Sequence, residues 1–200
     1  MSSDLLGSLM SQLGGGGVDQ IARSVGVSGG DVTNVLAGAL PAMMAGLTRN
    51  AASSGGAGAL LGALDRDHDG SILDDVMGYL GGGGTAGGAG ILGHVFGGRQ
   101  ANVEQAVSRS SGVDMGSVIK IMAMVAPLIM GSLGKAKRQQ GFDASGLAAA
   151  LGQQEKVARQ ASPSAVDMFT RLLDSDGDGS SMDDIVKMGS GLLGSLFGGK

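Results

Sequence analysis

Apolar residues along this chain recur at the spacing of one face of an α-helix, as they do over residues 107–125. The two longest uncharged apolar segments, residues 32–47 and 121–133, are shorter than the roughly 20 residues that a membrane span requires. We therefore interpret both as buried helices. No segment alternates strictly between apolar and polar residues, and β-branched residues are not clustered. The pattern predicts an all-α fold.

The chain also repeats itself. Residues 40–47 correspond to residues 126–133 at an offset of 86, and each segment has a proline as its second residue. The short turn at residues 26–28 corresponds to residues 112–114 at the same offset, and each turn ends in a good helix N-cap residue. We therefore predict a duplicated unit, in which each long apolar helix is interrupted at its proline.

Glycine divides the two copies. Residues 81–90 consist almost entirely of Gly and Ala with one Thr, a composition typical of a flexible linker. The sequence therefore predicts a first helical repeat at residues 1–80 and a second one at residues 91–200.

Two acidic loops, residues 65–75 and 174–184, share the pattern D-x-D-x-D-G-S-x-x-D-D and start 109 residues apart. Carboxylates at alternate positions, with Gly at the sixth, allow a loop of this length to fold around one hard cation. The backbone carbonyl at position 7 can add another oxygen. We therefore predict one Ca²⁺ ion in each loop. The predicted ligands, at positions 1, 3, 5, 7 and 11, are Asp65, Asp67, Asp69, Ser71 and Asp75, and Asp174, Asp176, Asp178, Ser180 and Asp184.

The charge distribution supports this prediction. The two loops contain 10 of the 18 acidic residues and a single basic residue, Arg66, so the rest of the chain carries 8 acidic and 13 basic residues. Two bound divalent ions would bring the formal net charge of −4 to zero. The acidity is thus local to the loops, whereas charge that serves solubility is usually spread more evenly.

The loops resemble those of the EF-hand and dockerin type, with one departure. An EF-hand loop has a bidentate Glu at position 12, where both loops here have an apolar residue. We expect the acid at position 11, Asp75 or Asp184, to close each site and to bind more weakly. In the alternative interpretation the loop is an Asp/Gly turn, and Asp74 and Asp183 cap the next helix. The recurrence of the pattern favours cation binding.

The chain as a whole resembles a known family. The segments ILGHVFGG at 91–98, 103–112, APLIMG at 126–131 and KAKRQQG at 135–141, together with the acidic loop and the short helix after it, are similar to the YidB-like family of bacterial proteins. The resemblance covers almost the whole chain. It implies an α-helical bacterial protein, and because the function of that family is unknown, it implies no catalytic residues.

A second class of function is suggested by residues 19–36, which are similar to the helix-turn-helix of lac-repressor-type regulators. Ala22 and Gly26 suit the packing and the turn of that motif. The start of the second helix, where side chains should reach base edges, instead carries two glycines and Asp31. A carboxylate at that place faces repulsion from phosphate. Nucleic-acid binding is therefore the less favoured alternative.

Composition excludes several catalytic chemistries. The chain has no Cys, which excludes disulfides, thiol catalysis and cysteine zinc sites, and its two His residues argue against a histidine metal site. No nucleophile–base pair and no phosphate-binding loop pattern is present. We therefore predict a protein that is not an enzyme and has no cofactor other than Ca²⁺.

The remaining charged side chains have simpler interpretations. Lys135, Lys137 and Arg138 read as a solvated helix end, where cations suit the helix dipole. His68, at loop position 4, is expected to point to solvent. His94 is expected to pack or to form a hydrogen bond.

Partners and location are less constrained. The apolar, Gly-containing segments at 5–10 and 192–197 suit packing on the core or self-association, so a self-assembling or envelope-associated module is a third hypothesis. The N-terminal residues lack a secretory signal, which favours the cytoplasm. Export by a signal-independent route stays open.

Overall fold

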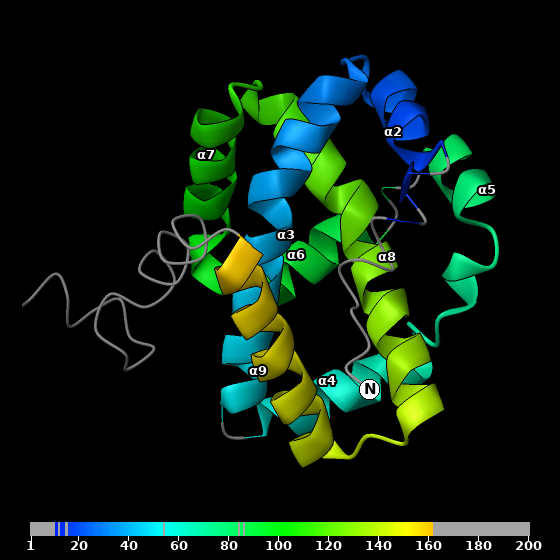
Figure 1. The fold of residues 1–200 in the computed structure, drawn as a ribbon, viewed down its shortest axis with the longest axis vertical. Coiled ribbons are helices and arrows are strands. Elements are labelled where there is room, and N and C mark those ends of the chain that lie inside the picture. The colour runs from blue at the N-terminus through cyan, green and yellow to red at the C-terminus, as the bar shows by residue number, and fades with distance from the viewer. Residues whose placement is uncertain are drawn as a thin grey trace, which may run out of the picture.

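The computed structural model describes residues 11, 13–14, 16–53, 55–83, 85 and 87–161, the last four of them by their backbone alone. Every regular element in this part of the chain is helical, which confirms the predicted fold class (Figure 1). The elements are α2 (Gly17–Val25), α3 (Gly29–Ala52), α4 (Gly56–Arg66), the 3₁₀ helix η1 (Ser71–Leu73), α5 (Val76–Gly81), α6 (Gly88–Phe96), the 3₁₀ helix η2 (Gly97–Arg99), α7 (Gln100–Ser111), α8 (Met115–Gln140) and α9 (Ala144–Ala161).

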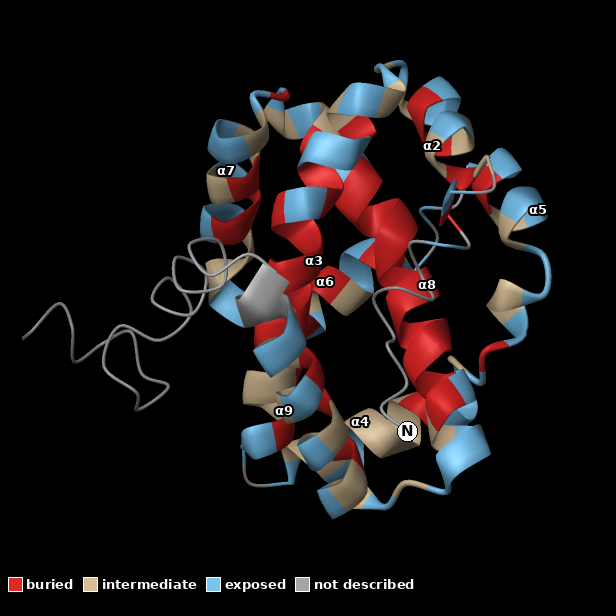
Figure 2. Ribbon diagram, viewed as in Figure 1, coloured by how far each residue is buried: buried red, intermediate tan, exposed pale blue. Residues whose placement is uncertain are grey.

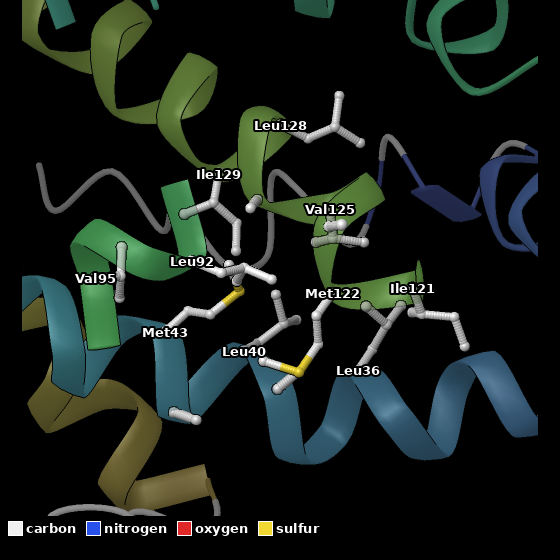
Figure 3. Close-up of a cluster of buried hydrophobic side chains, with 14 of the residues drawn as sticks. Leu36, Leu40, Met43, Leu92, Val95, Ile121, Met122, Val125, Leu128 and Ile129 are labelled. Carbon is white, nitrogen blue, oxygen red and sulfur yellow. The ribbon is translucent and has the colours of Figure 1, made fainter. Parts of the chain in front are cut away.

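The two longest helices, α3 and α8, form the centre of the molecule and hold most of its buried residues (Figure 2). Their facing sides meet through Leu36 and Leu40 of α3 and Met122 and Val125 of α8, with Leu92 of α6 beside them (Figure 3). A core with few aromatic side chains is filled by Leu, Ile, Val, Ala and pliable Met residues.

Both central helices begin in the way that the sequence predicts. Gly26 and Gly112 end the preceding helices α2 and α7 in the left-handed conformation, with φ of 86° and 73°. Ser28 then caps α3, where its hydroxyl accepts from the Asp31 N–H, and Asp114 caps α8 by accepting from the Ser117 N–H. The same sequence of a C-terminal glycine and a side-chain N-cap therefore occurs before both central helices.

The prolines lie inside continuous helices, so the predicted interruptions do not occur. Pro41 lies twelve residues after Gly29, the first residue of α3, and Pro127 lies twelve residues after Met115, the first of α8. Each proline lacks an N–H and leaves the carbonyl four residues earlier without its helical donor. Packing against the surrounding core therefore keeps both helices continuous, although one backbone hydrogen bond is missing at each proline.

Helices from the two predicted repeats share one core. From the second half, α9 packs along α3 and α4, and α6 packs on both α8 and α3. The predicted linker at 81–90 is flexible in composition but partly helical, because α6 begins at Gly88. A Cβ atom on Gly88 would lie 1.9 Å from the carbonyl oxygen of Ala123, so this glycine permits α6 to touch the backbone of α8.

Within the described residues, α8 is the one helix long and apolar enough to cross a bilayer by length and composition. Its most apolar 18-residue window has a mean hydropathy of 1.7, and 78% of that window is buried inside the fold. Burial of that extent is what the core helix of a bundle shows.

Candidate functional site

The first acidic loop joins α4 to α5 and turns sharply at its sixth residue. Asp67 caps the C-terminus of α4, and Gly70 adopts a φ of 95°, a conformation that favours glycine. The chain then forms η1 and enters α5. The prediction that glycine makes the turn at position 6 is confirmed.

The loop lies against the C-terminal half of α8. A Cβ atom on Gly134 would lie 1.8 Å from the carbonyl oxygen of His68, and one on Gly131 would lie 2.5 Å from Cγ2 of Ile72. Gly70 is buried in the same contact, 3.0 Å from the Gly131 carbonyl oxygen by the same measure. Two glycines three residues apart on α8 thus allow the loop to approach the helix closely.

Basic side chains at the end of α8 contact the loop carboxylates. Lys137 forms an ion pair with Asp65 at loop position 1, and Arg138 Nη1 lies 3.4 Å from Asp69 Oδ2 at position 5. Lys137 and Arg138 lie in the last turn of α8, as predicted, and Arg138 is exposed, but the prediction did not include their pairing with the loop. They are the counter-charges of the loop.

Asp69 also organises the turn that follows it. Its Oδ1 accepts a hydrogen bond of 2.9 Å from the Ser71 N–H. The hydrogen bonds from Ser71, and to a smaller extent the charge of Arg138, lower the pKa of Asp69 below its ordinary value. The carboxylate is thus held in its charged form.

His68 differs from its prediction, because its side chain is half-buried and does not simply point to solvent. Burial lowers the pKa of His68, and the charge of Asp67 opposes this effect in part. His94 is exposed, and its Nδ1 lies 2.7 Å from the Gly90 carbonyl oxygen, which confirms the expected hydrogen bond.

The last acid of the loop, Asp75, begins the next helix. Its Oδ1 accepts a 2.8 Å hydrogen bond from the Gly78 N–H and caps α5. A cap at this helix was the alternative interpretation of the loop, with Asp74 as the capping residue; the structure places Asp75 in that role. Ile72, Leu73 and Tyr79 pack against the core on either side of the cap, and burial raises the pKa of Tyr79 to about 12.

The predicted ligands of the first loop are all on its exposed side, but they do not converge. Asp65, Asp67, Asp69, Ser71 and Asp75 are exposed. In the described part of the chain, no group of three or more His, Cys, Asp or Glu side chains is close enough to hold a metal ion. The predicted ligands of the second loop, residues 174–184, lie outside the described residues, as do the apolar segments at 5–10 and 192–197.

Sequence reasoning missed the partner of the loop. The close-packed Gly134 and the two paired cations come from α8, more than 60 residues away along the chain. A signal was present in the segment GSLGKAKR, where two glycines three apart are followed by three cations within the next four residues. The opposite charge of the acidic loop could have identified these cations as its partners.

The helix-turn-helix candidate has the predicted local geometry. α2 and α3 are joined through left-handed Gly26, and Ala22 of α2 is buried. Asp31 at the start of α3 accepts from the N–H and hydroxyl of Ser28, so its carboxylate serves the capping box.

These features define a small helical bundle, built from two similar helix pairs, with an acidic loop docked on one central helix. The chain matches the family described as "Bacterial protein of unknown function (DUF937)" over residues 7–136 and again over residues 135–200. It belongs to that family, and the double match agrees with the predicted internal repeat and with the resemblance to YidB-like proteins. No curated protein and no solved structure matches the chain.

Proposed function

We propose that this protein is a non-catalytic calcium-binding protein in which one Ca²⁺ ion orders each acidic loop and fixes the helices on either side of it. The observation that carries the proposal is the repeated D-x-D-x-D-G pattern. Its glycine at position 6 has, in the first copy, the left-handed turn that such a loop requires.

Exposure and charge of the first loop support the proposal. Five carboxylates lie within eleven residues, and all of them face solvent, where a hydrated ion can reach them. Calcium accepts six to eight oxygen ligands in flexible geometry, so carboxylates that are spread along an exposed loop can close around it. Binding would require Asp65 and Asp69 to turn from their basic partners toward the ion.

Calorimetric titration tests the proposal. We expect two Ca²⁺ sites per chain, with weak competition from Mg²⁺, because Mg²⁺ demands strict octahedral geometry and gives up its waters reluctantly. Asp67→Ala and Asp176→Ala should each remove one site, since each takes a position-3 carboxylate from one loop. Absence of heat at millimolar calcium would contradict the proposal.

Two substitutions of Asp75 distinguish its proposed role as a calcium ligand from its role as the N-cap of α5. Asp75→Ser keeps a good N-cap residue but lacks the carboxylate, whereas Asp75→Ala loses both. If Asp75 closes the loop around calcium, both variants bind the ion more weakly while Asp75→Ser keeps the stability of the ion-free protein. If Asp75 is a cap alone, Asp75→Ser binds calcium like the parent protein.

Nucleic-acid binding is the second candidate, favoured by the helix–turn–helix geometry of α2 and α3. Its weak point is the capping role of Asp31 at the position where a recognition helix would contact bases. Retention on DNA that falls steeply with added salt would support this candidate. Retention that is absent at low salt would remove it.

A further inference from the structure

We propose that Lys137 and Arg138 are built-in competitors for the cation of the first acidic loop. In the ion-free protein they pair with two of the five loop carboxylates and help to hold the loop on α8, and they give way when a divalent ion binds. This inference rests on the proposed function, because it concerns the regulation of the same loop.

The pairing pattern is the first support. Lys137 and Arg138 contact loop positions 1 and 5, which hold two of the four predicted aspartate ligands of the first loop. A divalent ion held by the same two carboxylates would lie close to both positive groups. Repulsion between the ion and these groups must be relieved before the ion is fully coordinated.

The exposure of the two pairs is the second support. The Asp65 side chain is 60% exposed and that of Asp69 is 50% exposed, whereas the Lys137 side chain is 18% exposed. Exposed pairs of this kind are weak, so calcium can displace them without unfolding the site. The Asp65 carboxylate can turn on the solvent side, whereas that of Asp69 must also release its hydrogen bond from the Ser71 N–H, and the stem of Lys137 stays packed.

The backbone contacts also dock the loop on α8, and they do so without any charged group. The glycines of α8 hold His68 and Gly70 by close approach of backbone to backbone, with no charged group involved. Exchange of Lys137 and Arg138 for an ion can therefore take place at the side chains while the loop remains on α8. A competitor that is part of the same chain sets the calcium affinity of the loop independently of the ligands themselves.

The experiment uses the full chain with Asp176→Ala, so that the first loop reports alone. In that background, Lys137→Met/Arg138→Met is compared with Lys120→Met/Arg109→Met, which removes two exposed cations away from the loop and matches the change in net charge. Met keeps the aliphatic stem in each case. Calcium affinity is measured by calorimetry, and amide exchange of residues 65–75 is measured in chelator.

We expect the Lys137/Arg138 variant to bind calcium roughly tenfold more tightly than the control, since each surface pair accounts for up to about fivefold. In chelator, the amides of Ser71, Leu73 and Asp74 should exchange faster in this variant than in the control. Equal affinity in variant and control would overturn the inference and leave the proposed function standing. Equal amide exchange in chelator would overturn the holding role of the two cations. Absence of calcium binding in the parent, the variant and the control would overturn both proposals at this loop.

Discussion

The two central helices have the same beginning and different ends. Both α3 and α8 start after a left-handed glycine and a side-chain cap, and both carry a proline twelve residues on. Beyond the proline they diverge. At the offset of 86, Gly134 of α8 corresponds to Thr48 of α3 and Lys137 corresponds to Ala51, so these two residues of α8 that contact the acidic loop are replaced in α3.

The carbonyls released by the two prolines also differ. Pro41 frees the carbonyl of Ala37, a residue that is exposed on α3, where water can supply the missing donor. Pro127 frees the carbonyl of Ala123, which lies under the first turn of α6 at Gly88. In α8 the proline site has therefore become a packing site for a further helix.

The comparison of α3 with α8 shows which parts of the duplicated unit the fold constrains. The caps and the buried face are the same in both copies because the shared core requires them. The ends of the helices are free to change, and one copy has acquired a surface for a charged loop. Function is therefore to be sought where the copies differ, at the C-terminal half of α8.

The largest expected effect tests the shared core. Leu36 of α3 corresponds to Met122 of α8, and both side chains are fully buried. We expect Leu36→Ala and Met122→Ala to lower the free energy of unfolding by about 3 kcal/mol each, through the cavity and the lost apolar contact. Urea unfolding followed by circular dichroism measures both values.

The number of phases in the urea unfolding curve is as informative as its midpoint. With one core, both variants shift a single cooperative transition. A biphasic curve in which Leu36→Ala moves one phase and Met122→Ala moves the other would mean that the halves unfold independently, as two domains joined by a flexible linker at 81–90 would.

The next effect concerns the close contacts of α8 with the acidic loop and with α6. Gly134→Ala and Gly88→Ala each place a methyl group within 2 Å of a backbone carbonyl oxygen, that of His68 and that of Ala123. Backbone cannot move aside cheaply, so we expect a loss of about 1–3 kcal/mol in the free energy of unfolding. Thermal and urea unfolding provide the measurement.

Gly90→Ala in the same helix as Gly88 is the matched control. A Cβ atom on Gly90 meets nothing within 4 Å. Replacing a helical glycine by alanine at an open position should raise the free energy of unfolding by about 0.5–1 kcal/mol. If Gly88→Ala stabilised the protein as Gly90→Ala does, the close contact between α6 and α8 would be refuted.

The sequence predicted the helical class, the repeated turn with its caps and the position of the loop glycine, because these depend on local residue patterns. It did not predict that α3 and α8 continue past their prolines, since the packing that stabilises a helix with a missing hydrogen bond is tertiary. The contact of the loop with Gly134 and Lys137 was missed for the same reason. A residue pattern gives the charge of a loop but not the helix that comes to lie beside it.

The smallest effect contrasts the two N-cap side chains, the hydroxyl of Ser28, which does not ionise, and the carboxylate of Asp114, which does. Ser28→Ala should lower the free energy of unfolding by about 1 kcal/mol at pH 7, since it removes the acceptor of the Asp31 N–H. Asp114→Ala should also destabilise the protein at pH 7, because its carboxylate accepts from the Ser117 N–H. Hydrogen bonds from Ser117 lower the pKa of Asp114 below its ordinary value.

A lowered pKa in the folded protein means that the stabilisation by Asp114 is complete above its unfolded value and is lost as the pH falls through the folded value. The cost of Asp114→Ala should therefore shrink between pH 5 and about pH 2. The hydroxyl of Ser28 does not ionise, so its own hydrogen bond to the Asp31 N–H persists over that range. Urea unfolding of both variants and the parent protein across this range separates the caps. A cost of Asp114→Ala that stays constant down to about pH 2 would show that its charge contributes nothing to the start of α8.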